Sequence, residues 1–175
     1  LLSLFPFTED DEDISALGIA ASWVQQIVEV CFADSVEVGD VKQTILEEAE
    51  QTIELLGNSD DFLSPAEWAA LHPRIATGLQ NIASGNSFGD DTVQQKLLQL
   101  MEVSLRKSEP SPATSGVVLA GFGDRELLPS LDAYEIDGIL FGRLRARETK
   151  RFDTTRTSRG LIRPFAQSDM VYRFM

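Results

Sequence analysis

The chain has 175 residues, is 43% hydrophobic and carries a formal net charge of −13 at pH 7. That length fits one domain, or at most two small ones, and the apolar content is too high for a disordered chain. The single cysteine, Cys31, excludes an intrachain disulfide framework and a cysteine-rich zinc site. The single histidine, His72, excludes any metal or catalytic centre that needs two. We therefore expect neither a metal nor a cofactor.

The sequence shows no secretory signal and no membrane-spanning segment. Its longest weakly polar stretch, residues 14–28, includes two serines and two glutamines, whereas about 20 apolar residues are needed to cross a bilayer. We expect a cytoplasmic protein with no membrane partner. Because the chain opens at Leu1 and closes at Met175 in what reads as mid-element, we interpret it as an incomplete fragment of one domain.

Charge divides the chain into two regions. Residues 1–110 carry 20 acidic and 5 basic side chains, whereas residues 111–175 carry 8 acidic and 10 basic ones. The change coincides with a connection rich in proline and serine at residues 108–116. We predict an acidic helical region over 1–110 and a β-containing region over 111–175.

Apolar residues at helical spacing predict four helices in the acidic region. Asp13 is the expected N-cap of the first, and its apolar positions run from Ile14 to Cys31. The second helix is expected to begin at Asp40 and to end at Gly57.

The third and fourth predicted helices have clear start signals. Ser64-Pro-Ala-Glu67 combines an N-cap serine, a proline at the first helical position and the glutamate of a capping box. Pro73 is expected to kink or restart this helix, because it lacks the N–H that an interior position donates. Asp91 is expected to open the fourth helix.

The second region reads as strands. Residues 117–122 form an apolar run that predicts a buried strand, and residues 124–131 are expected to form one helical turn. Asp137-Gly138 lies between two strand-like runs and predicts a hairpin turn, because a type I′ turn needs two residues with positive φ. A further strand at 161–165 and a final helix capped by Ser168 follow. The predicted class is α+β, with about four helices followed by an antiparallel region containing a β-hairpin.

Two motifs resemble binding loops without completing them. Gly121-Phe-Gly-Asp-Arg-Glu126 follows a strand, as a phosphate loop would, but the third glycine of a dinucleotide site and the lysine of a P-loop are missing. The acidic run from Glu9 to Asp13 lacks the glycine and the distant glutamate of a calcium loop. We interpret the first as a tight exit from a strand and the second as a solvated helix start.

A basic face is the candidate binding surface. Arg143, Arg145 and Arg147 alternate, so on a strand all three point to the same side, and Lys150 and Arg151 extend the cluster. A net charge of −13 would repel nucleic acid, and no aromatic residues interleave with the basic ones. We expect the face to meet acidic groups of its own helices, of a second copy or of another protein. The chain would then be a non-enzymatic helical module for interaction or self-assembly.

Two segments resemble a known family. They are Gly116-Val-Val-Leu-Ala-Gly-Phe-Gly-Asp-Arg-Glu-Leu-Leu-Pro-Ser-Leu131 and Arg163-Pro-Phe-Ala-Gln-Ser-Asp-Met-Val-Tyr-Arg-Phe-Met175. Both are similar to the later part of uncharacterised bacterial proteins of the proteasome-β-like, N-terminal-nucleophile (Ntn) hydrolase type. The resemblance covers about residues 116–175. It implies part of an αββα sandwich and hydrolysis of amide bonds, with the acidic helices as an insertion or a lateral layer.

The resemblance leaves the catalytic residues unassigned. In this type of enzyme, the nucleophile is an N-terminal Thr, Ser or Cys whose own α-amine acts as base. This chain begins with Leu1, and no residue in it matches that motif. The resemblance therefore implies a nucleophile outside these residues, and a hairpin that joins a sheet of at least four strands.

Overall fold

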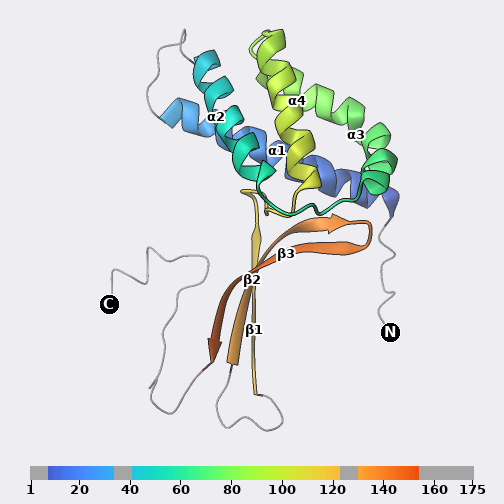
Figure 1. Ribbon diagram of the computed structural model, residues 1–175, viewed down its shortest axis with the longest axis vertical. Coiled ribbons are helices and arrows are strands. Elements are labelled where there is room, and N and C mark those ends of the chain that lie inside the picture. Colours follow the sequence, from blue (N-terminus) through green and yellow to red (C-terminus); the bar gives the residue numbers. More distant parts are fainter. Residues whose placement is uncertain (1–7, 34–40, 123–129, 154–175) are drawn as a thin grey trace. The chain divides into compact units, whose positions relative to one another are not determined.

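The computed structural model of the chain describes residues 8–33, 41–122 and 130–153 (Figure 1). Four helices precede a three-stranded antiparallel sheet, which confirms the predicted α+β class. Contacts divide the chain into a helical unit, Leu1–Ala113 with Asp137–Arg145, and a sheet unit, Thr114–Ile136 with Ala146–Met175. The helices are α1 (Glu9–Ala33), α2 (Val41–Gly57), α3 (Pro65–Asn86) and α4 (Asp91–Arg106). The strands are β1 (Ser115–Gly121), β2 (Ser130–Leu140) and β3 (Arg143–Asp153).

The helical unit has one apolar core. Both α1 and α4 pack against the other three helices. The core includes the fully buried side chains of Ile45, Leu71, Ile75, Leu79, Leu97, Leu100, Met101 and Leu105. By length and composition alone, residues 9–32 of α1 would suffice to cross a bilayer, but here the helix packs as a core element of the bundle.

The start of α1 differs from the prediction. Thr8 caps this helix, since its N–H and hydroxyl donate to Asp11 at 3.0 and 2.7 Å and its hydroxyl accepts from the Asp11 N–H at 3.2 Å. The predicted cap at Asp13 was therefore wrong, and the acidic run fills the first turn, where the helix dipole favours it. The buried face of α1 also differs from the predicted one, because Ile14, which was expected on it, is 70% exposed, whereas Ile19 is buried.

The other three helices follow their sequence signals closely. Helix α2 ends at Gly57 as predicted, and α3 has the predicted capping box of Ser64 and Glu67. Pro73 lies inside α3 and the helix continues through it, so the expected restart was wrong, whereas a kink there stays a prediction. Helix α4 begins at Asp91 as predicted, and Asp90 caps it by accepting from the N–H groups of Thr92 and Val93.

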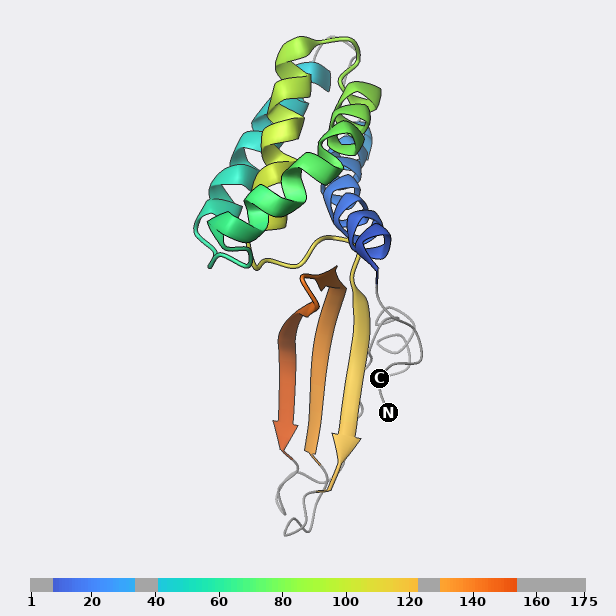
Figure 2. The same ribbon diagram turned by 90° about the vertical axis from the view of Figure 1, so that its right-hand side faces the viewer.

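The strands lie side by side in the order β1-β2-β3 (Figure 2). The pairing of β1 with β2 runs from Ser115 opposite Ile136 to Gly121 opposite Ser130. All seven residues of β1 are exposed, so the expectation of a buried strand was wrong for the described residues. The predicted helical turn at 124–131 lies mostly outside those residues, but its last two positions belong to β2.

The hairpin turn lies further along the chain than predicted. β2 continues through Asp137 and Gly138, and the turn is formed by Phe141 and Gly142, whose φ angles are 51° and 64°. Two successive positive φ angles are typical of the type I′ turn. The expected strand at 161–165 and the helix capped by Ser168 lie outside the described residues.

Candidate functional site

The richest polar centre in the helical unit surrounds the hairpin end, residues 137–145. Helix α1 supplies the acceptors for its backbone: the Ser15 hydroxyl accepts from the Ile139 N–H at 3.2 Å, and the Glu12 carboxylate accepts from the Phe141 N–H. Gly138 makes this approach possible, because a Cβ there would lie 2.5 Å from the Ser15 Oγ and 2.9 Å from the Ile19 Cδ1. Gly138 is thus required for close packing and not for a turn.

A buried ion pair holds both strands of this hairpin end. Arg145 is 2% exposed, and its Nε lies 3.4 Å from the Oδ1 of Asp137. Its guanidinium also donates to the carbonyls of Ser104 at 3.3 Å and Glu109 at 2.8 Å, while Asp137 accepts from the Ser111 N–H at 2.7 Å. Burial lowers the pKa of Arg145, and the negative charge of Asp137 offsets part of that effect. The cluster connects the hairpin to the end of α4.

Arg143 lies against the segment that leads into α3. Its Nη2 donates to the carbonyl of Phe62 at 2.9 Å and to the Glu67 carboxylate at 2.9 Å, and its guanidinium lies 4.7 Å from the centroid of the Phe62 ring. The pKa of Glu67 is lowered by hydrogen bonds from the backbone and side chain of Ser64, and further by Arg143. Arg143 therefore places its positive charge beside the Glu67 carboxylate of the capping box.

A second arginine cluster joins α1 to α3. Arg74 lies 3.0 Å from Glu12 and 2.5 Å from Asp13, and it donates to the carbonyl of Glu9 at 2.8 Å. Burial opposes the charged form of Arg74, but the hydrogen bonds and charges of the two carboxylates outweigh it and raise its pKa. Glu12 thus binds both the Arg74 guanidinium and the backbone N–H of Phe141 in the hairpin.

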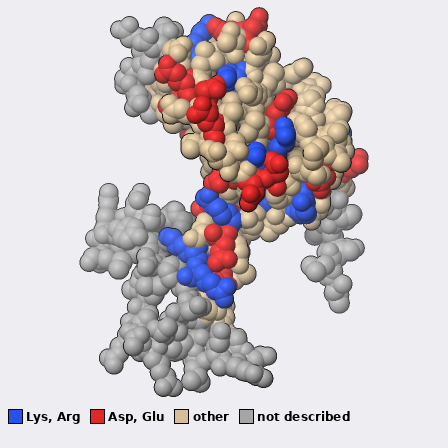
Figure 3. Space-filling view, in the orientation of Figure 1, with Lys and Arg blue, Asp and Glu red and all other residues tan. Residues whose placement is uncertain are grey.

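The remaining predicted basic residues lie in the sheet. Arg147 pairs with Glu135 at 2.8 Å and Arg151 with Asp132 at 3.6 Å, while Lys150 is exposed. Basic side chains gather on the sheet in the view of Figure 3. Because Arg145 is buried, it does not contribute to an exposed basic face. That the other four bind a partner stays a prediction.

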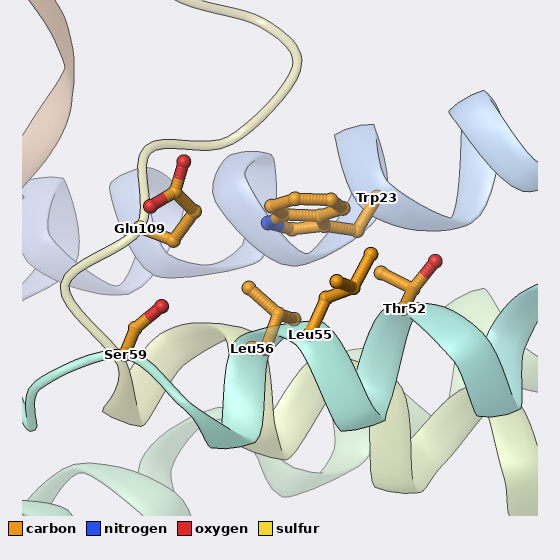
Figure 4. A pocket seen from close by; sticks show the side chains of 6 residues that line it. All are labelled: Trp23, Thr52, Leu55, Leu56, Ser59 and Glu109. Atoms are coloured by element: carbon orange, nitrogen blue, oxygen red, sulfur yellow. The ribbon is translucent and has the colours of Figure 1, made fainter.

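One pocket of about 340 Å³ opens in the helical unit (Figure 4). The indole of Trp23 lies against the leucines of α2, with Glu109 at one end of the pocket. The Thr52 hydroxyl donates to the carbonyl of Glu48 at 2.8 Å, so it is engaged within its own helix. The lining residues are Trp23, Thr52, Leu55, Leu56, Ser59 and Glu109. We see here no pairing of a nucleophile with a base.

Cys31 and His72, the other two candidate residues, have neighbours that are typical of a structural role. Cys31 is buried in the core, and the Nε2 of His72 lies 3.2 Å from Glu102 on a half-exposed surface. In the described part of the chain, no three His, Cys, Asp or Glu residues gather in a way that would hold a metal. The glycine motif continues past Phe122 and out of the described residues.

Sequence reasoning missed Glu12, Ser15 and Asp137, the side chains that hold the hairpin end. No local pattern marks Glu12 and Ser15, because the backbone groups that they bind lie more than 100 positions away in the chain. Asp137 pairs with Arg145 of the next strand and also accepts from the Ser111 N–H, 26 positions earlier. The comparisons with known proteins add no assignment: no family model, curated protein or solved structure matches the chain.

Proposed function

We propose that the chain is part of a cytoplasmic bacterial protein with the proteasome-β-like Ntn-hydrolase fold. The reaction is hydrolysis of an amide bond, and the nucleophile lies outside these residues. The observation that carries the proposal is the exposure of β1. Its apolar side chains lie on both sides of the sheet, with Val117 37%, Val118 39% and Leu119 58% exposed.

An apolar strand that is bare on both faces is unusual in water. Continuous apolar runs are typical of strands covered on both sides, whereas a strand with one wet face alternates apolar and polar residues. An αββα sandwich would cover one face of this sheet with helices and the other with a second sheet. The exposed apolar residues of β1 support such a layered context.

The order of elements is also compatible with the resemblance. Residues 116–121 of the quoted segment lie in β1, and the strands that follow pair as a hairpin, β2 with β3. The three described strands fall short of the four that the resemblance predicts, so the sheet in this proposal gains strands from outside the described residues.

The test uses the protein produced from its complete reading frame. We expect self-cleavage before a Thr, Ser or Cys, seen as a mass loss by intact-protein mass spectrometry. An electrophilic acylating probe should then label that new N-terminal residue. Replacing the labelled residue with alanine should abolish both labelling and cleavage of a fluorogenic peptide panel. A full-length chain with an unprocessed N-terminus and no labelling would contradict the proposal.

A second candidate function is binding of an acidic protein surface by the sheet. It is favoured by the exposure of the β3 side chains, since Arg147 is 48% and Arg151 63% exposed. Binding of this kind weakens with salt. A triple variant, Arg147/Lys150/Arg151→Glu, should abolish salt-sensitive association measured by sedimentation. Unchanged association in that folded variant would count against it.

A further inference from the structure

The outer edge of β1 differs from a protected sheet edge. The order β1-β2-β3 leaves it without a partner among the described strands. Its seven residues, SGVVLAG, include no charge and no proline, and all are exposed. Proteins normally guard a free edge with charged residues, proline or a bulge. The opposite edge strand, β3, has such protection, because its sequence RLRARETKRFD is dominated by charged residues.

The sequence of β1 is complementary to itself when reversed. In an antiparallel pair centred on Val118, apolar side chains meet apolar ones and small residues meet small ones. Directly opposed residues lie on the same face and make contact, so this matching has energetic value. The opposed pairs are Val117 with Leu119, Gly116 with Ala120, and Ser115 with Gly121. A two-fold symmetric interface requires this kind of self-complementarity.

We propose that β1 of one chain pairs antiparallel with β1 of a second copy about a two-fold axis at Val118. The two sheets then form one continuous sheet in the order β3-β2-β1-β1-β2-β3. Main-chain hydrogen bonds supply the affinity, as in other cases of strand addition. Because β1 contains no charged residue, this pairing brings no like charges together, although the whole chain carries a net charge of −13. The proposal requires that any further strands of the complete protein leave the β1 edge free, and it stands apart from how the faces of the sheet are covered.

Charge placed at the two-fold axis tests the pairing. Val118→Lys would place two lysine side chains opposite each other, with their Cβ atoms about 5 Å apart, so we expect the dimer dissociation constant to rise at least about tenfold. Leu144→Lys is the matched control, because it adds the same charge at a 51% exposed apolar residue of β3. Analytical ultracentrifugation of a dilution series measures both, and circular dichroism checks that each variant is folded.

Crosslinking tests the register of the β1–β1 pairing separately. It also tests the pairing itself if Val118→Lys fails to fold. In the proposed pairing, Val118→Cys places two thiols opposite each other, so mild oxidation should give a covalent dimer. Leu55→Cys, at a 71% exposed residue of α2, should stay monomeric on a non-reducing gel, and the native Cys31 is buried. The proposal is overturned if the unmodified protein is monomeric at every concentration or if Val118→Cys does not crosslink. Loss of the dimer in Leu144→Lys alone would also overturn it.

Discussion

Asp137 and Arg145 face each other across the β2–β3 hairpin, and their side chains are only 0% and 1% exposed. Removing one member of a buried pair leaves the other charge without compensation, which costs about 3–5 kcal/mol. We expect Arg145→Met to lower the free energy of unfolding by about that amount. Urea unfolding followed by circular dichroism measures the change.

The control for this pair lies in the sheet. Arg147→Met removes an arginine from an exposed pair with Glu135, and such pairs contribute about 0–1 kcal/mol. In the double variant Asp137→Leu/Arg145→Met, the loss should be smaller than the sum of the two single losses. Additive losses would show that the two side chains are not coupled in the folded protein.

Gly138 should not tolerate a side chain. Gly138→Ala drives a Cβ into Ser15 and Ile19, and overpacking of this kind costs about 1–3 kcal/mol. Gly18→Ala is the matched control, because its Cβ would meet no atom within 4 Å and alanine favours the helix. We expect thermal unfolding to show a lower midpoint for the first variant and an equal or higher one for the second. Equal midpoints for both variants would argue against the close approach.

The turn should depend on Gly142. Its φ of 64° lies in the left-handed region, where an L side chain costs about 1–2 kcal/mol. Gly142→Ala should therefore destabilise the protein by about that amount in urea. Gly85→Ala, in α3 and with open space around it, should be neutral or stabilising. A neutral Gly142→Ala would contradict the turn.

Stability should fall in acid through Glu67. Hydrogen bonds from Ser64, with Arg143 nearby, lower its folded-state pKa below 4.5. A lowered pKa means that the carboxylate stabilises the fold above about pH 4.5, and that this contribution disappears as the pH falls through the folded value. Glu67→Gln should flatten the acid limb of a plot of unfolding midpoint against pH. The exposed Glu47→Gln controls for the general loss of a negative charge, and an equal effect would refute the assignment.

Local signals predicted local features well. The capping box of Ser64 and Glu67 satisfies its own helix end, so four residues contain all the information it needs. The Asp137-Gly138 turn signal failed for the opposite reason. Asp137 faces Arg145 in the next strand, and Gly138 faces Ser15 of α1, so remote packing overrides the local preference for a turn.

The sequence alone could not predict which face of α1 is buried or what covers β1, and the two reasons are related. Residues around Ile14 and Ile19 are apolar on nearly all sides of the helix, so periodicity alone does not single out one stripe. The apolar run of β1 indicates a strand, but what lies against it depends on other elements. The candidate site shares this limit, because Glu12 and Phe141 are 129 positions apart.

That separation has a consequence for biosynthesis. Leu140 belongs to the core of the helical unit and is fully buried there. On the ribosome, all four helices emerge before the residues that complete their core. We expect a partly consolidated intermediate with exposed apolar surface until Arg145 has left the exit tunnel, after which native packing can close. The hairpin end would then be the last piece of the helical unit to fold, and translational pauses before it would prolong the period of greatest aggregation risk.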